Sequence, residues 1–184
     1  LVGAGLLPAL ALARQALPSL QAVIVGAGPL CQELQSEIDR FGLREAVIVH
    51  DNRNDSELAV LMQHALCLVL LSRREGFGLV ALEAMRFGTP ALVLVHPDSA
   101  ASERVSENKN GVEVGSLEPP ILASAILSVH ASGNAIPFRY SSDGKFSFEK
   151  LSLKTLCSCG AIWRSTLILA HISFSAAASC STSA

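Results

Sequence analysis

Short apolar runs alternate with amphipathic segments along most of the chain. Continuous apolar runs are typical of strands that are buried on both faces, and they occur at 22–25, 46–49, 67–71 and 91–95. Apolar residues spaced three or four positions apart predict helices at 30–41, 55–64, 78–87, 99–107 and 119–130. A further short strand is predicted at 112–114.

The repeated strand–helix order predicts an α/β fold with a doubly wound, Rossmann-like parallel sheet, because parallel strands need crossover helices on both faces. Ligands on such sheets bind at the carboxyl ends of the strands. We therefore expect the functional residues in the loops that follow the strands, at 26–29, 50–54, 72–78 and 96–99.

The two ends of the chain differ from this pattern. Residues 1–13 are apolar, but they are too short to span a bilayer and lack the basic start of a signal peptide. We expect a truncated N-terminus that begins inside or just before a helix. Residues 146–156 predict one more helix, so that the domain extends over 1–156. The segment 157–184 is rich in Ser, Ala and Cys, and we expect it to be an atypical, poorly ordered tail.

Composition narrows the class of protein. The chain has 184 residues, of which 50% are hydrophobic and 16% charged, as expected for one domain with a buried sheet. The net charge of −2 predicts no general attraction to nucleic acid or anionic lipid. Five cysteines at irregular spacing favour reduced thiols and a cytoplasmic setting, and no group of residues has the spacing of a metal site.

The most informative stretch is Glu75-Gly76-Phe77-Gly78-Leu79, which continues into a helix that carries Glu83. An apolar strand, a glycine turn and a helix N-terminus together favour an anionic ligand, because backbone N–H groups and the helix dipole point toward it. Carboxylates accept hydrogen bonds from hydroxyls. A sugar nucleotide offers both an anion and hydroxyls.

A dinucleotide-binding site is the main rival from another class. Gly26 and Gly28 follow a strand, and Asp51 ends the next strand as a possible ribose acceptor. However, Cys31 stands where the third glycine of that fingerprint belongs, and a side chain there prevents close packing of helix and sheet. The NAD-type interpretation also leaves Glu75 and Glu83 unexplained.

Several motifs together resemble the C-terminal, donor-binding domain of the group 1 glycosyltransferases, which are retaining enzymes of the GT-B fold. The resemblance covers residues 1–130, and its specific part is the pair of glutamates separated by seven residues. The matching segments are Val-Ile-Val-Gly-Ala-Gly-Pro-Leu at 23–30, Phe-Gly-Leu at 41–43, residues 75–85, Gly-Thr-Pro at 88–90, Glu103, and Asn-Gly at 110–111.

The resemblance implies roles for the motif residues. It implies that Glu75 binds hydroxyls of the donor sugar and that Glu83 binds the ribose. It also implies that the turn formed by Gly76, Phe77, Gly78 and Leu79 offers backbone N–H groups to the sugar and diphosphate.

The loop after the second strand, with Asn52 and Arg53, matches the position that holds the base. Gly26 and Gly28 belong to the matching strand end. The resemblance implies no cofactor and no metal. Arg73 and Arg74 are either a solvated pair or a supplement to diphosphate binding.

The same resemblance implies parts that lie outside this chain. An Arg and a Lys that hold the diphosphate belong before Leu1, as does an N-terminal acceptor-binding domain. We expect the longer protein to transfer a sugar from a nucleotide-activated donor to an unidentified acceptor, with peripheral membrane association possible through the other domain. The isolated chain is expected to be inactive. The alternatives are a binding or interaction domain without catalysis, or a phosphorylase or epimerase of the same architecture.

Overall fold

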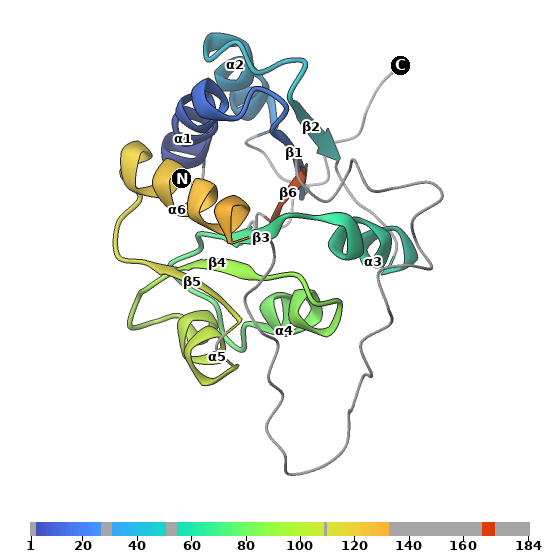
Figure 1. Ribbon diagram of the computed structural model, residues 1–184, viewed down its shortest axis with the longest axis vertical. Coiled ribbons are helices and arrows are strands. Elements are labelled where there is room, and N and C mark those ends of the chain that lie inside the picture. Colours follow the sequence, from blue (N-terminus) through green and yellow to red (C-terminus); the bar gives the residue numbers. More distant parts are fainter. Residues whose placement is uncertain (1–2, 27–30, 51–54, 109, 133–166, 172–184) are drawn as a thin grey trace.

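The computed structural model describes residues 3–26, 31–50, 55–108, 110–132 and 167–171 (Figure 1). Within these ranges, all strands belong to one parallel sheet. The strands are β1 (Gln21–Val25), β2 (Val47–His50), β3 (Cys67–Leu70), β4 (Ala91–Leu94), β5 (Gly111–Val114) and β6 (Leu167–His171). The helices are α1 (Gly3–Ala16), α2 (Cys31–Arg40), α3 (Asp55–His64), α4 (Leu79–Arg86), α5 (Ala100–Asn108) and α6 (Pro119–Ala131).

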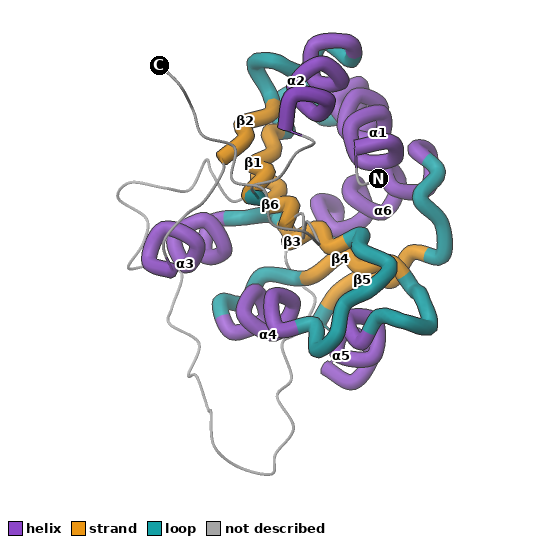
Figure 2. The backbone as a smooth tube through the Cα atoms, turned by 180° about the vertical axis from the view of Figure 1, so that it is seen from behind, coloured by secondary structure: helices purple, strands orange, loops and turns teal. Residues whose placement is uncertain are grey.

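The helices cover both faces of the sheet, as the sequence predicts (Figures 1 and 2). One face of β1 presents Ala22 and Ile24 to a core that also contains apolar residues of α1, α2 and α6. The opposite face presents Val23 and Val25 to a second core, together with apolar residues of α3, α4 and α5. This alternation follows from the twofold period of a strand, and it explains why the strand sequences are continuously apolar.

The strands lie in the order β2-β1-β6-β3-β4-β5. The chain first moves outward from β1 to β2 and then returns across the sheet to β3, β4 and β5. The direction of winding therefore reverses between β1 and β3, and in open α/β sheets this reversal marks the ligand crevice.

The position of β6 differs from the expectation for the tail, where the sequence predicted no regular element. Residues 167–171 lie between β1 and β3 and pair in parallel with both strands, with Leu169 opposite Val23 on one side and Leu68 on the other. A continuous apolar run is typical of a central parallel strand, but its partners are distant in sequence, so local pattern cannot place it. The helix expected at 146–156 lies outside the described residues.

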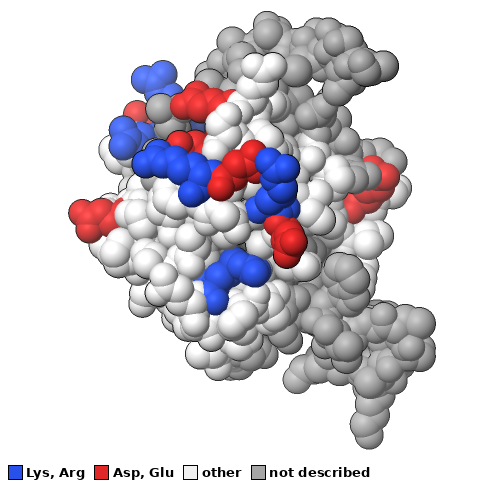
Figure 3. Space-filling view, turned by 90° about the horizontal axis from the view of Figure 1, so that it is seen from above, with Lys and Arg blue, Asp and Glu red and all other residues white. Residues whose placement is uncertain are grey.

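Charged side chains of both signs are intermixed on the face shown in Figure 3. Ion pairs among the described residues include those of Arg40 with Glu37 and of Arg44 with Asp39. The Arg44 guanidinium holds the pKa of the Asp39 carboxyl below its ordinary value by a direct hydrogen bond. Over the described residues, the face in Figure 3 has no broad region of one sign, which agrees with the small net charge.

Candidate functional site

Glu75 lies at the carboxyl edge of the sheet, in the loop that follows β3. Its backbone forms an isolated parallel bridge with Ser99, in the loop that follows β4. The Glu75 N–H donates to the Asp98 carbonyl at 3.3 Å, and the Ala100 N–H donates to the Glu75 carbonyl at 2.9 Å. These two hydrogen bonds fix the motif loop against the start of α5.

The Glu75 side chain is half-buried, and its carboxylate is held from within the same loop. The Ser72 hydroxyl donates to Glu75 Oε2 at 2.9 Å. A hydrogen bond to an ionised oxygen is stronger than one between neutral groups, and here it restricts the orientation of the carboxylate. Glu75 is thus a positioned hydrogen-bond acceptor at the edge where ligands of such sheets bind.

Gly78 makes the sharp turn from the loop into α4. Its φ of 63° and ψ of 30° place it in the left-handed region, which favours glycine. A Cβ atom at this position would lie 2.9 Å from Ala101 Cα, which is closer than normal contact allows. Gly78 is also the N-cap of α4, so its conformation determines where the helix begins and where the first N–H groups point.

The rest of the motif is presented to solvent. Phe77 and Leu79 are 70% and 61% exposed, which is unusual for large apolar side chains. Glu83 is exposed on α4, while Ala81, Ala84 and Met85 form the buried face of the same helix. The turn and the first part of α4 therefore offer backbone N–H groups, apolar surface and a carboxylate.

The other predicted site residues are only partly described. Gly26 lies at the end of β1, where its N–H donates to the His50 carbonyl at 3.0 Å. Gly28, Asn52 and Arg53 lie outside the described residues. Their predicted roles stay predictions.

Neither metal coordination nor a membrane span is found in the part of the chain that the structure describes. Over these residues, no group of three or more His, Cys, Asp or Glu side chains is arranged to hold a metal ion. Over the same residues, no helix combines the length and apolar character that crossing a bilayer requires.

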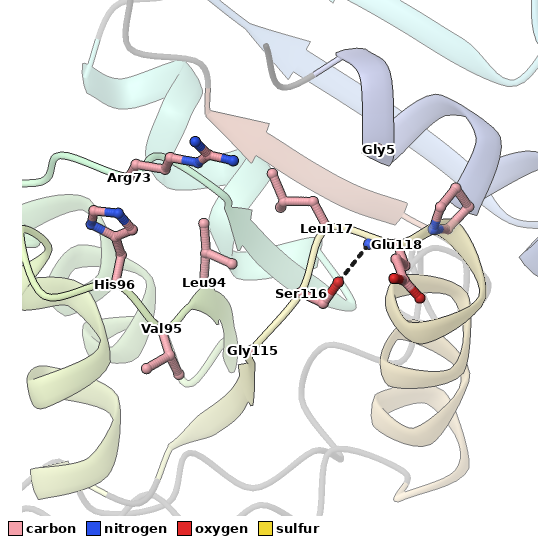
Figure 4. Close-up of a pocket in the computed structure, with 10 residues that line it drawn as sticks. Gly5, Arg73, Leu94, Val95, His96, Gly115, Ser116, Leu117 and Glu118 are labelled. Atoms are coloured by element: carbon pink, nitrogen blue, oxygen red, sulfur yellow. Dashed lines mark hydrogen bonds between the residues drawn. The ribbon is translucent and has the colours of Figure 1, made fainter.

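A pocket of about 560 Å³ lies beside the motif, at the carboxyl ends of β4 and β5 (Figure 4). Arg73 and His96 come from the loops after β3 and β4, whereas Ser116, Leu117 and Glu118 come from the loop between β5 and α6. Sequence reasoning missed this last loop. The short strand predicted at 112–114 was the available signal, because its following loop also lies at the carboxyl edge.

Comparisons with known proteins agree with this geometry. The model of the glycosyl transferases group 1 family matches residues 4–134. A GDP-mannose:cellobiosyl-diphosphopolyprenol alpha-mannosyltransferase from Xanthomonas oryzae pv. oryzae is 33% identical over 132 residues, which cover 66% of this chain and 35% of the relative. A D-inositol 3-phosphate glycosyltransferase from an Arthrobacter species is 41% identical over 91 residues, which cover 47% of this chain and 22% of the relative.

A solved structure supports the same assignment. Sucrose-phosphate synthase from Thermosynechococcus elongatus superposes with a TM-score of 0.58 at 26% identity, over 71% of this chain and 34% of that one. The chain thus spans about a third of the length of this protein and of the first curated relative. From its family match, its parallel sheet and this superposition, the chain belongs to the group 1 glycosyltransferases and forms a Rossmann-like half of the GT-B fold.

Proposed function

We propose that the longer protein transfers a sugar from a nucleotide-activated donor to an acceptor with retention of anomeric configuration, and that this chain is its donor-binding half. The observation that carries the proposal is the strand–turn–helix unit in which a positioned Glu75 and an exposed Glu83 flank the left-handed Gly78. Membership of the group 1 family supports the reaction class.

Each carboxylate has its own task in this proposal. Glu75, oriented by Ser72, accepts hydrogen bonds from hydroxyls of the donor sugar and places the anomeric carbon. Glu83, one turn into α4, accepts hydrogen bonds from the ribose. The N–H groups around Gly78 and the N-terminal dipole of α4 favour the negatively charged diphosphate.

The chemical step is a substitution at the anomeric carbon. The bond to the donor diphosphate breaks, a bond to an acceptor oxygen forms, and the acceptor proton leaves with the departing phosphate. Basic side chains and N–H groups stabilise the charge that develops on the diphosphate, and we propose that no metal or other cofactor takes part.

The remaining partners are also proposals. The name of the Xanthomonas relative includes GDP-mannose, which makes a GDP-sugar one donor to test first. We propose that the acceptor binds mainly to a second domain, outside this chain, and that the protein works in the cytoplasm, with any membrane contact made through that domain. Nucleic acid is not a proposed partner.

Nucleotide binding by this chain tests the donor role. Titration calorimetry with UDP, GDP and ADP should show one preferred nucleotide, and Glu83→Ala should weaken its binding about tenfold or more. Glu45→Ala is the matched control, because Glu45 is exposed but lies just before β2, at the opposite edge of the sheet. Equal losses in both variants, or no loss in either, would refute the role of Glu83.

Turnover tests the catalytic part of the proposal. In the longer protein, Glu75→Ala should lower kcat with little change in nucleotide affinity. The isolated chain should bind the nucleotide weakly at best and release none from a nucleotide sugar, since the proposed acceptor domain is outside it. Release of nucleotide by the isolated chain would contradict the division of roles. A longer protein that binds the donor without turnover would favour the alternative of a binding domain without catalysis.

A further inference from the structure

The loop after β4 is closed by a hydrogen bond to a ring nitrogen. Residues 96–99 form a tight turn, in which the Ser99 N–H donates to the His96 carbonyl at 3.0 Å. Pro97 stands at the second position of this turn, where proline is favoured. In addition, the Asp98 N–H donates to His96 Nδ1 at 3.2 Å. The imidazole thus acts as an Asn or Asp side chain does at the first position of a turn, where it accepts the N–H two residues on.

The same turn holds the motif glutamate by its backbone. The Asp98 carbonyl accepts the Glu75 N–H at 3.3 Å, and the Glu75 carbonyl accepts the Ala100 N–H at 2.9 Å. Asp98 therefore donates its N–H to His96 and offers its carbonyl to Glu75. This one residue connects the imidazole to the loop that carries the candidate sugar-binding carboxylate.

Only a neutral imidazole can accept the Asp98 N–H. A protonated ring carries a hydrogen on both nitrogens and accepts at neither, so it would direct an N–H toward another N–H. The Asp98 carboxylate is the alternative partner, because its Oδ2 lies 3.9 Å from His96 Nδ1. Protonation of the ring would therefore exchange the backbone N–H for the carboxylate and open the turn.

Charged side chains from two other loops line the same pocket as His96. Arg73 belongs to the loop after β3, and Glu118 belongs to the loop between β5 and α6 (Figure 4). Arg73 opposes a positive charge on the ring, whereas Glu118 and Asp98 favour it. The consequence of protonation is the same in either case, because only the neutral ring accepts the Asp98 N–H.

We propose that His96 is a positioning residue for the Glu75 loop and that it makes the position of this loop depend on pH. Neutral His96 closes the turn and keeps the Asp98 carbonyl at the Glu75 N–H, and protonated His96 releases it. Histidines change charge between about pH 5 and 8, so the loop is held at the upper end of this range and loosened at the lower end. The inference rests on the proposed function only for its effect on glycosyl transfer, since the link from His96 to Glu75 lies within this chain.

Nuclear magnetic resonance on the full chain tests the link without a ligand. As the pH falls from about 8 to 5, the amide signals of Asp98 and Glu75 should shift with the same midpoint as the His96 ring. His96→Asn should abolish this shift, because an Asn side chain accepts the same N–H but does not titrate. A Glu75 amide that does not follow the His96 ring, or that shifts equally in the Asn variant, would overturn the proposal.

His64→Asn is the matched control for this titration. His64 lies at the end of α3, where its Nδ1 is 2.8 Å from the Val60 carbonyl, so the ring donates there whether neutral or protonated. The substitution should leave the response of the Glu75 amide unchanged. If His64→Asn removed the response as completely as His96→Asn, the pH effect would be a general one and the proposal would be wrong.

Affinity of the longer protein for GDP-mannose tests the consequence for the donor site. Between about pH 8 and 5, the unsubstituted protein should lose about threefold to tenfold more affinity than His96→Asn, the range expected for one hydrogen bond. His96→Ala offers no acceptor and should show the lower affinity at every pH, whereas Asn restores it. Identical pH profiles for the unsubstituted protein and His96→Asn would overturn the effect on the donor site.

The two measurements also separate this inference from the proposed function. If no variant binds GDP-mannose but the Glu75 amide follows the His96 ring, the positioning role stands and the result counts against the proposed donor. If GDP-mannose binds but the Glu75 amide is independent of the His96 ring, the donor role stands and the positioning role is refuted.

Discussion

Gly78 packs against Ala101 so closely that a Cβ atom at position 78 would lie 2.9 Å from Ala101 Cα. Gly78→Ala should destabilise the protein by about 1–3 kcal/mol, because the side chain opposes a positive φ, and the close contact forces a shift of α4 or α5. Urea unfolding measures the loss.

The other glycine of the motif, two residues before Gly78, provides the control for this prediction. A Cβ atom at Gly76 would meet nothing within 4 Å. Gly76→Ala should therefore leave the unfolding midpoint almost unchanged. If the two substitutions cost the same, the contact between Gly78 and Ala101 does not determine the turn.

Leu169→Pro should unfold the sheet or lower its stability severely. Residue 169 lies in the middle of β6, with Val23 and Leu68 opposite it, and proline cannot donate to a central ladder. Thermal unfolding followed by circular dichroism gives the measurement. Leu169→Val retains the N–H and favours extended backbone, so it should retain a cooperative transition. A proline variant as stable as the unsubstituted chain would contradict a central position for β6.

Thr89→Val should cost about 1 kcal/mol, which is typical for a lost hydrogen bond. Thr89 is buried, and its hydroxyl donates to the Met62 carbonyl, which joins the end of α3 to the turn before β4. Thr89→Ser keeps the hydroxyl and should recover part of this stability in chemical denaturation. Equal stability of the valine variant and the unsubstituted chain would show that the bond contributes nothing.

Ser72→Ala should reduce affinity for a nucleotide sugar by about tenfold or less, the range expected for one hydrogen bond. The substitution releases the Glu75 carboxylate, which Ser72 holds at 2.9 Å. Affinity for the matching nucleoside diphosphate should not change, because Glu75 is proposed to contact the sugar. A comparable loss for both ligands would place Glu75 at the nucleotide instead.

Cys67 should resist alkylation at pH 8 in the folded protein. Burial raises the pKa of the Cys67 thiol from its ordinary value of 9.0 to about 12, so the reactive thiolate is scarce. The pKa of Cys67 is higher in the folded than in the unfolded state. The contribution of the protonated Cys67 thiol to folding stability is therefore complete below pH 9 and is lost as the pH rises toward 12. Peptide mass spectrometry should find the half-buried Cys31 labelled before Cys67. Equal labelling rates would show that Cys67 is accessible.

Local periodicity was enough to predict most of the fold. The helices and strands from β1 to α6 lie within a few residues of their predicted positions because each has its own pattern, such as buried Leu34 and Ile38 on one side of α2. The Glu75 loop was predictable for a similar reason, since strand, glycine turn and helix follow one another directly. The glycine spacing indicated the turn.

Long-range relationships were not predictable in the same way. The position of β6 depends on pairing with β1 and β3, which lie far from it in the sequence, and neither the bridge from Glu75 to Ser99 nor the pocket has a local signature. Arg73 and Glu118 line the same pocket only because β3 and β5 end at the same edge of the sheet. Such contacts require the strand order, which the sequence pattern does not contain.

The central position of β6 also has a consequence for the order of folding. The ribosome releases β1 and β3 long before residues 167–171, and both strands pair with β6 in the finished sheet. Until then, each strand has an unpaired edge that another chain can occupy. Contacts between segments so far apart in sequence also form slowly. A nascent or newly diluted chain should therefore pass through a period when aggregation and strand exchange compete with folding, and this period ends when β6 enters the sheet between β1 and β3.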